Sequence, residues 1–413
     1  MDAIHITVGV GTDQVATAAG QAAALTAIAT ARKCFGHVTL VASDDAPLIA
    51  KLPIGTTLQR AARRLGARIA KTPSHKTTHT IAIGTVTRRP GWSIQCWWDR
   101  WLSGTRASTE PAGDSRLALS GTFSAALTVR QIFAGVLAGK PLRARDATIS
   151  LWTPWMATDR CIVGPECFDF PDHIWFLGLG HLGQGFVWNL CLLGSKGGRA
   201  IIQDDQNIGE ENEATSLLVL GDDIGEKKTR VAARWLKGCG WTTNIIERRH
   251  RGDICLLPED PPYLLCGLDR VEPRLEMAKH GFDYMLDAGL GHGPHDFEGI
   301  QIRIVAKGDA ASDLWITTTV DSPHRERPPN VAYADLEQVI GRCGVVSFAD
   351  ASTSVPFVGA AAGALVIAQA VRLASLHETT RFLQMELSAP EMVSTADFVR
   401  KPQANLGSIT VQL

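Results

Sequence analysis

With 413 residues, 45% of them hydrophobic, the chain is long enough for two or three domains and apolar enough for a large core. The formal net charge of −1 excludes the strongly basic balance of a dedicated nucleic-acid binder. The longest apolar run, residues 357–371, is rich in alanine and glycine, so we expect a buried helix there and no contact with a membrane.

The nine cysteines are scattered along the chain, and no two of them form a C-x-x-C pair. This spacing argues against a structural zinc site with four thiolates, and the composition fits a reduced cytoplasm. The N-terminal sequence MDAIHITVGVG has no basic n-region of a secretory signal. We therefore expect a cytoplasmic location.

Strand and helix patterns alternate over the first 150 residues. Ile4–Gln14 predicts a strand that enters a glycine turn, and an alanine-rich helix follows over Ala16–Lys33. Further strands are predicted at His37–Val41 and Thr80–Gly84. From Ser120, a helix of small residues leads through a short polar link to a closing strand. This order indicates an α/β fold.

Two segments of this half carry no clear helix pattern. Arg88–Asp114 is rich in tryptophan, proline and glycine. We expect it to be a loop that packs the two halves of the chain together, with a partner-binding surface as the alternative. A linker is predicted over residues 152–171, where proline, glycine and acidic residues gather.

The second half opens with a pattern that is typical of phosphate binding. Ile174–Leu177 predicts a strand, Gly178, Gly180 and Gly183 form G-x-G-x-x-G, and an apolar helix pattern continues to Leu193. Glycines between a strand and a helix N-terminus let the backbone approach a phosphate, whose charge the helix dipole favours. On its own the motif is a weak signal for nucleotide binding.

Acidic side chains follow two strands of this half. The strand Ala200–Ile202 ends before Asp204 and Asp205, where a dinucleotide fold carries an acid for a ribose hydroxyl. The strand Leu264–Leu268 has Asp269 at its C-terminal tip. Open α/β sheets bind their ligands at that edge, so these acids are candidate ligand contacts.

Cations begin the helix that follows the segment NIGEENEATS. Lys227, Lys228 and Arg230 lie in its first turns, where the helix dipole disfavours positive charge. Their placement indicates a site for a triphosphate. The alternative is a solvated basic helix face.

The two halves repeat the same pattern of elements, which indicates a duplicated fold. Two unrelated α/β halves that share only their alternation of strands and helices are the alternative. The first copy lacks the chemistry of the second: Gly9 and Gly11 are followed by Ala16 and not by a third glycine, and Lys228 has no counterpart. We therefore expect the first copy to be degenerate.

The order of the motifs in the second half resembles the adenylation domain of the ubiquitin-activating enzyme superfamily, which includes the ThiF-type adenylyltransferases of thiamine and molybdopterin biosynthesis. These motifs are G-x-G-x-x-G, an acid after the second strand, a loop with asparagine, I-G-x-x-K and L-D-x-x-x-x-R. The most similar members are the simplified bacterial (Bil-type) enzymes encoded beside ubiquitin-like proteins in antiphage operons.

This resemblance implies two tandem Rossmann-like, ThiF-type adenylation folds in one α/β chain. An inactive domain would span residues 1–151, a linker residues 152–171, and an active domain with a catalytic cysteine loop residues 172–413.

The resemblance also implies roles for polar residues around ATP. Asp205 would bind the ribose, with Asp204 as the alternative by a one-residue shift. Asn212 matches the asparagine of the family, but the phosphate-contacting arginine three residues later is replaced by Thr215. Arg230 or an arginine of the first half would have to take its place.

For two further motifs, the resemblance implies roles at the phosphates of ATP. Lys228, with Lys227 as the alternative, matches the lysine that neutralises phosphate charge in the transition state. Asp269 matches the aspartate that binds Mg²⁺, and Arg274 matches an arginine that braces the same loop. Taken alone, Asp269 and Arg274 fit an ordinary helix cap and a surface base.

Family members carry their reactive cysteine just before the last long helix, which is the place of Cys343 in this sequence. The neighbouring Arg342 would favour its thiolate form. The alternative is a buried, inert cysteine. We expect Cys191, Cys255 and Cys266 to lie in the core.

The implied function is MgATP-dependent adenylation of the C-terminal glycine of a ubiquitin-like protein. A thioester on Cys343 would then hand that protein to a conjugating-enzyme-like partner in antiphage defence. A homodimer stays open. The alternatives are an inactive scaffold subunit, an adenylyltransferase for a sulfur-carrier protein, and a Rossmann oxidoreductase, which leaves Lys228 and Asp269 without roles.

Overall fold

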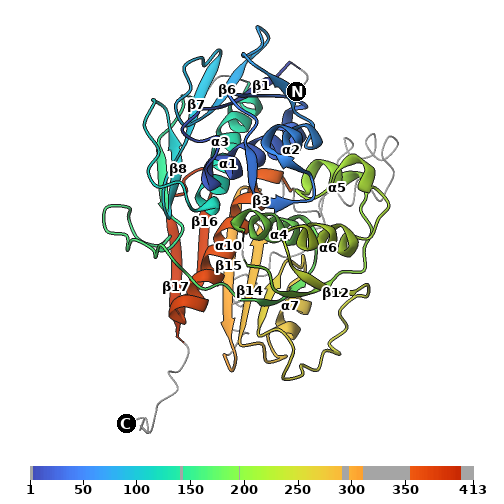
Figure 1. Cartoon of the computed structure of the whole chain (residues 1–413). Helices are drawn as coiled ribbons and strands as arrows, with labels where there is room; N and C mark the ends of the chain where they lie inside the picture. Colours follow the sequence, from blue (N-terminus) through green and yellow to red (C-terminus); the bar gives the residue numbers. More distant parts are fainter. Residues whose placement is uncertain (1–2, 140–142, 195, 291–296, 310–353, 401–413) are drawn as a thin grey trace, which may run out of the picture.

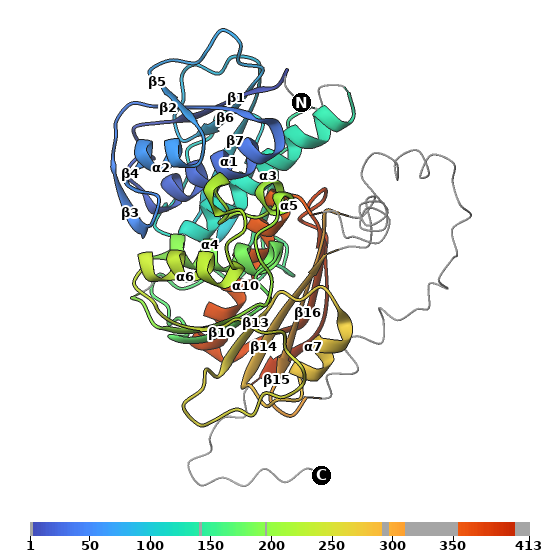
Figure 2. The ribbon, with the colours of Figure 1, turned by 90° about the vertical axis from the view of Figure 1, so that its right-hand side faces the viewer.

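The computed structural model describes residues 3–139, 143–194, 196–290, 297–309 and 354–400, without the side chains of residues 397–400. Within these residues each half of the chain forms one large sheet, and a layer of helices lies between the two sheets (Figures 1 and 2). The sheets are mostly parallel, so the expected α/β class is confirmed.

The first sheet has the strand order β5-β2-β1-β6-β7-β8-β9, with α1 and α3 against it. Strands β1 to β7 of this sheet run parallel, and β8 and β9 are antiparallel. Its elements are β1 (His5–Val10), α1 (Ala18–Phe35), β2 (His37–Ala42), α2 (Leu58–Arg64), β5 (Arg68–Ala70), β6 (His79–Ile83), β7 (Trp92–Asp99), β8 (Leu102–Arg106), α3 (Ala118–Leu137) and β9 (Ala147–Ser150), and β3 (Pro47–Leu52) and β4 (Gly55–Thr57) form a separate hairpin.

The second sheet has the order β12-β11-β10-β13-β14-β15-β16-β17, with its last three strands antiparallel. The two sheets share one strand order when the β3–β4 hairpin is left out. In the first sheet β5, β2, β1, β6 and β7 lie side by side from one edge, and β12, β11, β10, β13 and β14 take the same places in the second sheet. The elements of this half are β10 (His173–Leu177), α4 (His181–Leu193), β11 (Arg199–Gln203), α5 (Glu210–Thr215), the 3₁₀ turn η1 (Gly221–Asp223), α6 (Lys228–Gly238), β12 (Thr242–Ile246), β13 (Tyr263–Cys266), α7 (Val271–Met277), β14 (Tyr284–Leu290), β15 (Gly299–Ala306), α10 (Pro356–Leu376), β16 (Glu378–Glu386) and β17 (Val393–Arg400).

Helices α4 and α10 touch backbone to backbone. A Cβ added to Gly185 would lie 2.2 Å from the carbonyl oxygen of Gly359, and one added to Gly363 would lie 2.3 Å from that of Gly185. The side chain of Asn189 donates a hydrogen bond to the carbonyl oxygen of Ala360 at 3.0 Å. Glycine is therefore required wherever the two backbones meet.

The two halves share one hydrophobic core. Trp188 of α4 donates a hydrogen bond to Thr26 of α1 at 3.0 Å, and α3 packs against α10. Helix α10 is long and apolar enough to cross a membrane by length and composition, but 94% of its most apolar window is buried inside the protein. The prediction of a buried helix at residues 357–371 is confirmed.

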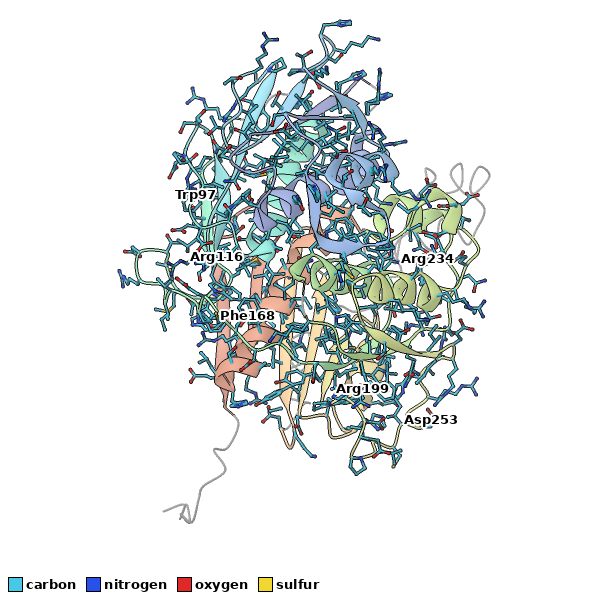
Figure 3. All side chains as sticks on the ribbon, viewed as in Figure 1. Trp97, Arg116, Phe168, Arg199, Arg234 and Asp253 are labelled. Atoms are coloured by element: carbon cyan, nitrogen blue, oxygen red, sulfur yellow. The ribbon has the colours of Figure 1, made fainter. Side chains whose placement is uncertain are left out.

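The prediction of a loop over Arg88–Asp114 was wrong, because strands β7 and β8 occupy its middle. Every second residue of β7, at Ile94, Cys96 and Trp98, is buried in the core. Trp97 points to the other face, where the guanidinium of Arg106 lies 3.8 Å from its ring centre (Figure 3). Polar and aromatic residues stand between these buried positions, so the sequence did not show the alternation of apolar and polar residues that is typical of a strand.

The contact between α4 and α10 predicts a strong effect of a single methyl group. We expect Gly185→Ala to lower the free energy of unfolding by about 3 kcal/mol, because the new Cβ would overlap the α10 backbone. The measurement is urea unfolding followed by tryptophan fluorescence. The matched control is Gly180→Ala at the start of α4, where a Cβ meets no atom within 4 Å. Equal stability of Gly185→Ala and the control would contradict the packing argument.

Candidate functional site

The glycine turn after β10 leaves an open space in front of α4. Gly178 has a φ of +78°, and a Cβ on Gly183 would lie 2.0 Å from the carbonyl oxygen of Gly178. Gly180 is the N-cap of α4, and it has no side chain that could accept a capping hydrogen bond. A Cβ placed on Gly180 would meet no atom within 4 Å. The space beside Gly180 is thus open at the N-terminus of α4, which is where an anion binds at a helix N-terminus.

The equivalent turn of the first half is filled by its own side chains. Thr17 caps α1 by accepting a hydrogen bond from the N–H of Gly20 at 3.0 Å. The carboxylate of Asp13 accepts one from the N–H of Thr85 at 2.9 Å and lies 2.3 Å from where a Cβ of Gly11 would be. A cap and a negative charge therefore stand where the second half has an opening.

The two acids after β11 differ in what their carboxylates do. Asp204 accepts hydrogen bonds from the N–H of Leu179 in the glycine turn, at 2.6 Å, and from that of Gln206, at 2.8 Å. One oxygen thus holds the glycine turn against the end of β11, and the other holds the segment that follows this strand. The side chain of Asp205 is 39% exposed and faces Arg249 at 3.4 Å. Asp205 therefore has the more accessible carboxylate for a ligand.

Two lysines converge on the end of β11. Residues 206–208 pair with residues 225–228, which brings the start of α6 beside that strand end. The ammonium of Lys228 donates to the side-chain oxygen of Gln206 at 2.6 Å, and that of Lys227 donates to the carbonyl oxygen of Asp205 at 2.7 Å. Lys228 is 6% exposed. The fold thus positions two positive charges at the carboxyl edge of the sheet.

A cavity of about 650 Å³ opens beside Lys227. Three of its residues are cations, of which Arg230 is paired with Glu247 at 2.8 Å and Arg234 with Asp223 at 2.5 Å. Acids thus neutralise both arginines, and Glu226 also lines the cavity, so Lys227 supplies its remaining positive charge. Its lining consists of Asn207, Gly225, Glu226, Lys227, Arg230 and Arg234.

Helix α5 lies against the start of α4. The ring Nδ1 of His181, the first residue of α4, is 2.8 Å from the carbonyl oxygen of Thr215. Burial lowers the pKa of His181 to about 4, so the ring is neutral at pH 7 and Nδ1 carries the donated proton. Asn212 is 8% exposed and accepts a hydrogen bond from the N–H of Gly209. Thr215, which replaces the family arginine, donates to the carbonyl oxygen of Glu211.

Asp269 stands on the rim of the same sheet edge, three residues beyond β13. Its side chain is exposed, and it makes no hydrogen bond or ion pair with the described part of the chain. It does not cap α7, whose N-cap is Arg270. Mg²⁺ prefers one or two carboxylates together with phosphate oxygens and water, so a free carboxylate here fits such an ion.

Arg274 holds the loop that carries Asp269. It is 7% exposed, and its Nε donates to the carbonyl oxygen of Leu268 at 2.9 Å. Its Nη1 lies 3.3 Å from the carboxylate of Asp287, which is fully buried and also faces Arg303 at 4.0 Å. Burial raises the pKa of Asp287, against the effect of the two arginines. Sequence reasoning missed Asp287 because it sits in an apolar strand run.

The structure separates the cysteines into two groups. Cys191 and Cys266 are buried, as expected, and burial raises the pKa of both thiols well above the usual range. The expectation for Cys255 was wrong, because it is exposed in the loop after β12 rather than on a buried strand. Cys343 and Arg342 lie outside the described residues.

Asp204 and Asp205 thus lie at the carboxyl edge of the second sheet, next to the glycine turn and to Lys227 and Lys228. Among the described residues, no group of three or more His, Cys, Asp or Glu side chains is arranged to hold a metal ion by itself. A metal ion at this site would therefore need oxygens from a ligand as well.

Solved structures resemble this chain only loosely. E. coli MccB with ATP is 14% identical, with a TM-score of 0.37 over 56% of this chain and 65% of that one. The selenomethionine form of PaaA is 12% identical, with a TM-score of 0.36 over 55% of this chain and 72% of that one. The chain matches slightly less than two thirds of MccB, and at these scores the likeness says nothing about individual residues.

Comparisons of sequence are more specific. The family model of the BilD N-terminal domain matches residues 5–151, and that of the BilD C-terminal domain matches residues 170–377. The bacterial E1-like protein BilD of Collimonas sp. (strain OK412) is 30% identical over 385 residues, covering 89% of this chain and 82% of that protein. This chain therefore belongs to the BilD family of bacterial E1-like proteins.

Proposed function

We propose that this protein uses ATP to adenylate the C-terminal glycine carboxylate of a ubiquitin-like protein. The observation that carries the proposal is the contrast between the two glycine turns. The turn at Gly180 is open and has two lysines and Asp205 beside it, whereas the turn at Gly11 is filled by Asp13 and capped by Thr17. The turn at Gly180 therefore has room beside the N-terminus of its helix for phosphate oxygens, and the turn at Gly11 does not.

In the first step, a carboxylate oxygen of the ubiquitin-like protein attacks the α-phosphorus of ATP. The bond from that phosphorus to the bridging oxygen breaks, and pyrophosphate leaves with the electron pair. Asp205 would accept the ribose hydroxyls, and Lys228 would neutralise charge on the phosphates. Asp269 would hold Mg²⁺, which supplies further positive charge at the phosphates. The main contributions of the protein are positioning and electrostatic stabilisation.

In the second step, the thiolate of Cys343 would attack the carbonyl carbon of the acyl-adenylate. A thioester forms and AMP leaves. The ubiquitin-like protein would then pass to a conjugating-enzyme-like partner. This step rests on the family resemblance, which also suggests a cytoplasmic role in antiphage defence.

The same proposal gives the first half a non-catalytic role. Both sheets share one strand order, which supports a duplicated ThiF-type fold with an inactive domain at residues 1–151 and an active one at residues 172–413. Thr215 at the position of the family arginine is the observation that favours an inactive scaffold instead. Exchange of labelled pyrophosphate into ATP separates these two functions.

We expect wild-type protein, supplied with a ubiquitin-like protein that ends in glycine, to catalyse ATP–pyrophosphate exchange. Lys228→Met should lower the exchange rate about 100-fold, because it removes a charge that stabilises the transition state. Lys237→Met, at the exposed far end of the same helix, is the matched control and should retain the wild-type rate. Absence of exchange in the wild type would favour the scaffold, and equal rates in the two variants would contradict the role of Lys228.

The magnesium role predicts a shift in metal dependence. We expect Asp269→Asn to need about tenfold more Mg²⁺ for half-maximal exchange, because one anionic ligand is lost. Glu272→Gln, which removes an exposed acid three residues away, should leave the Mg²⁺ titration unchanged. Identical titrations for both variants would remove Asp269 from the metal site.

The proposed thioester on Cys343 predicts that one variant loses the covalent adduct and keeps adenylation. Cys343→Ala should keep pyrophosphate exchange but lose the adduct with the ubiquitin-like protein that thiol reagents cleave on a denaturing gel. Cys255→Ala removes an exposed cysteine elsewhere and should keep both. A reducible adduct that survives in Cys343→Ala would assign the thioester to a different residue.

A further inference from the structure

The stretch from Glu213 to Val219 comprises the end of α5 and most of the segment that leads to η1, and it belongs to neither large sheet. Buried backbone groups need hydrogen-bond partners, so a segment without a strand partner must find them elsewhere. Leu217, Leu218 and Val219 are fully buried or nearly so. The partners of this stretch are largely side chains of the surrounding helices.

Helices α4 and α6 supply three of these side chains. His181 donates to the carbonyl oxygen of Thr215 at 2.8 Å. Gln184 accepts from the N–H of Leu218 at 3.1 Å, and Trp235 donates to the carbonyl oxygen of Leu218 at 3.1 Å. These bonds hold the middle of the stretch against the second half.

The two ends of the stretch are held by a residue of the first half. Lys33, in the last turn of α1, donates from its ammonium to the carbonyl oxygen of Glu213 at 2.5 Å and to that of Val219 at 3.0 Å. One side chain thus joins two carbonyl groups that are six residues apart. Burial lowers the pKa of Lys33 to about 8, while the nearby Glu213 carboxylate opposes that shift, so the side chain remains mainly protonated at pH 7.

We propose that Lys33 is a positioning residue for the ATP site. By fixing both ends of the stretch from Glu213 to Val219, it keeps α5, with Asn212, seated on the glycine turn at His181. The first half, whose own turn is filled, would thereby contribute to nucleotide binding in the second. This inference rests on the proposed function, since it assumes that the open turn binds ATP.

A second cation of the first half reaches the second half without binding the backbone of residues 213–219, and it provides a matched control for Lys33. Arg64 of α2 also reaches the second half, where it pairs with Asp222 at 2.6 Å. Both side chains of that pair are largely exposed, at 47% and 62%, and neither holds the backbone of residues 213–219. Exposed ion pairs contribute little to stability. Arg64→Met therefore removes a cation at the junction between the halves without releasing the stretch.

The test compares Lys33→Met, Lys33→Arg and Arg64→Met in the full chain. Equilibrium ATP affinity, the KM for ATP and kcat in pyrophosphate exchange, and amide hydrogen exchange of residues 210–220 are measured for each. We expect Lys33→Met to weaken ATP binding and raise the KM about tenfold or more, with kcat little changed, because two hydrogen bonds from a charged donor are lost. Hydrogen exchange over residues 210–220 should accelerate in the same variant.

Lys33→Arg retains a cation and its donors, so it should recover ATP affinity to within about threefold of the wild type. Arg64→Met should match the wild type in every measurement. The inference is overturned if Lys33→Met behaves like Arg64→Met, if hydrogen exchange changes without a change in ATP affinity, or if Lys33→Arg fails to restore affinity. A wild type that binds ATP but shows no exchange would count against the proposed reaction alone, because ATP affinity and hydrogen exchange still test Lys33.

Discussion

The rest of the molecule depends on the backbone contact between α4 and α10. Their glycines let the helices approach until Gly185 and Gly363 leave no room for a side chain. Helix α4 begins at the open glycine turn, and α10 also packs against α3 of the first half. One close contact therefore sets the position of the site relative to both sheets. Overpacking at such a contact costs more than removal of an exposed ion pair, which is consistent with glycine at Gly185 of α4 and with the many small residues of α10.

The two halves share one strand order but differ at their glycine turns. The first N–H groups of any helix lack partners within the helix and must be satisfied by a cap, by solvent or by a ligand. In the first half, Thr17 accepts a hydrogen bond from the first turn of α1, and the carboxylate of Asp13 lies beside the glycine turn. In the second half, Gly180 has no side chain that could cap α4. The neighbouring acid Asp204 is then used for the turn itself, and Asp205 keeps its charge at the rim. A few side chains at a strand end, and not the sheet, therefore distinguish the two glycine turns.

Much of this architecture was predictable because it follows from local patterns. Residue spacing predicted the glycine turn, the start of α6 at Lys228 and the buried helix α10. It could do so because apolar residues recur with a different period in helices and in strands. The strand pair at Arg88–Asp114 was not predicted, because polar and tryptophan residues on its outer face masked the alternation. Lys33 and its contacts were beyond the reach of pattern reasoning, since the residues that meet are about 180 positions apart. The role of Cys343 stays a prediction.

The shared helix layer has a consequence for how the site is assembled. If the halves were separate chains, a contact such as that from Lys33 to Glu213 would form only in the associated complex, and its occupancy would fall on dilution. Joining them through residues 152–171 converts that association into an intramolecular event with a high effective concentration. The covalent connection thus makes the seating of α5 independent of how many copies of the protein a cell contains.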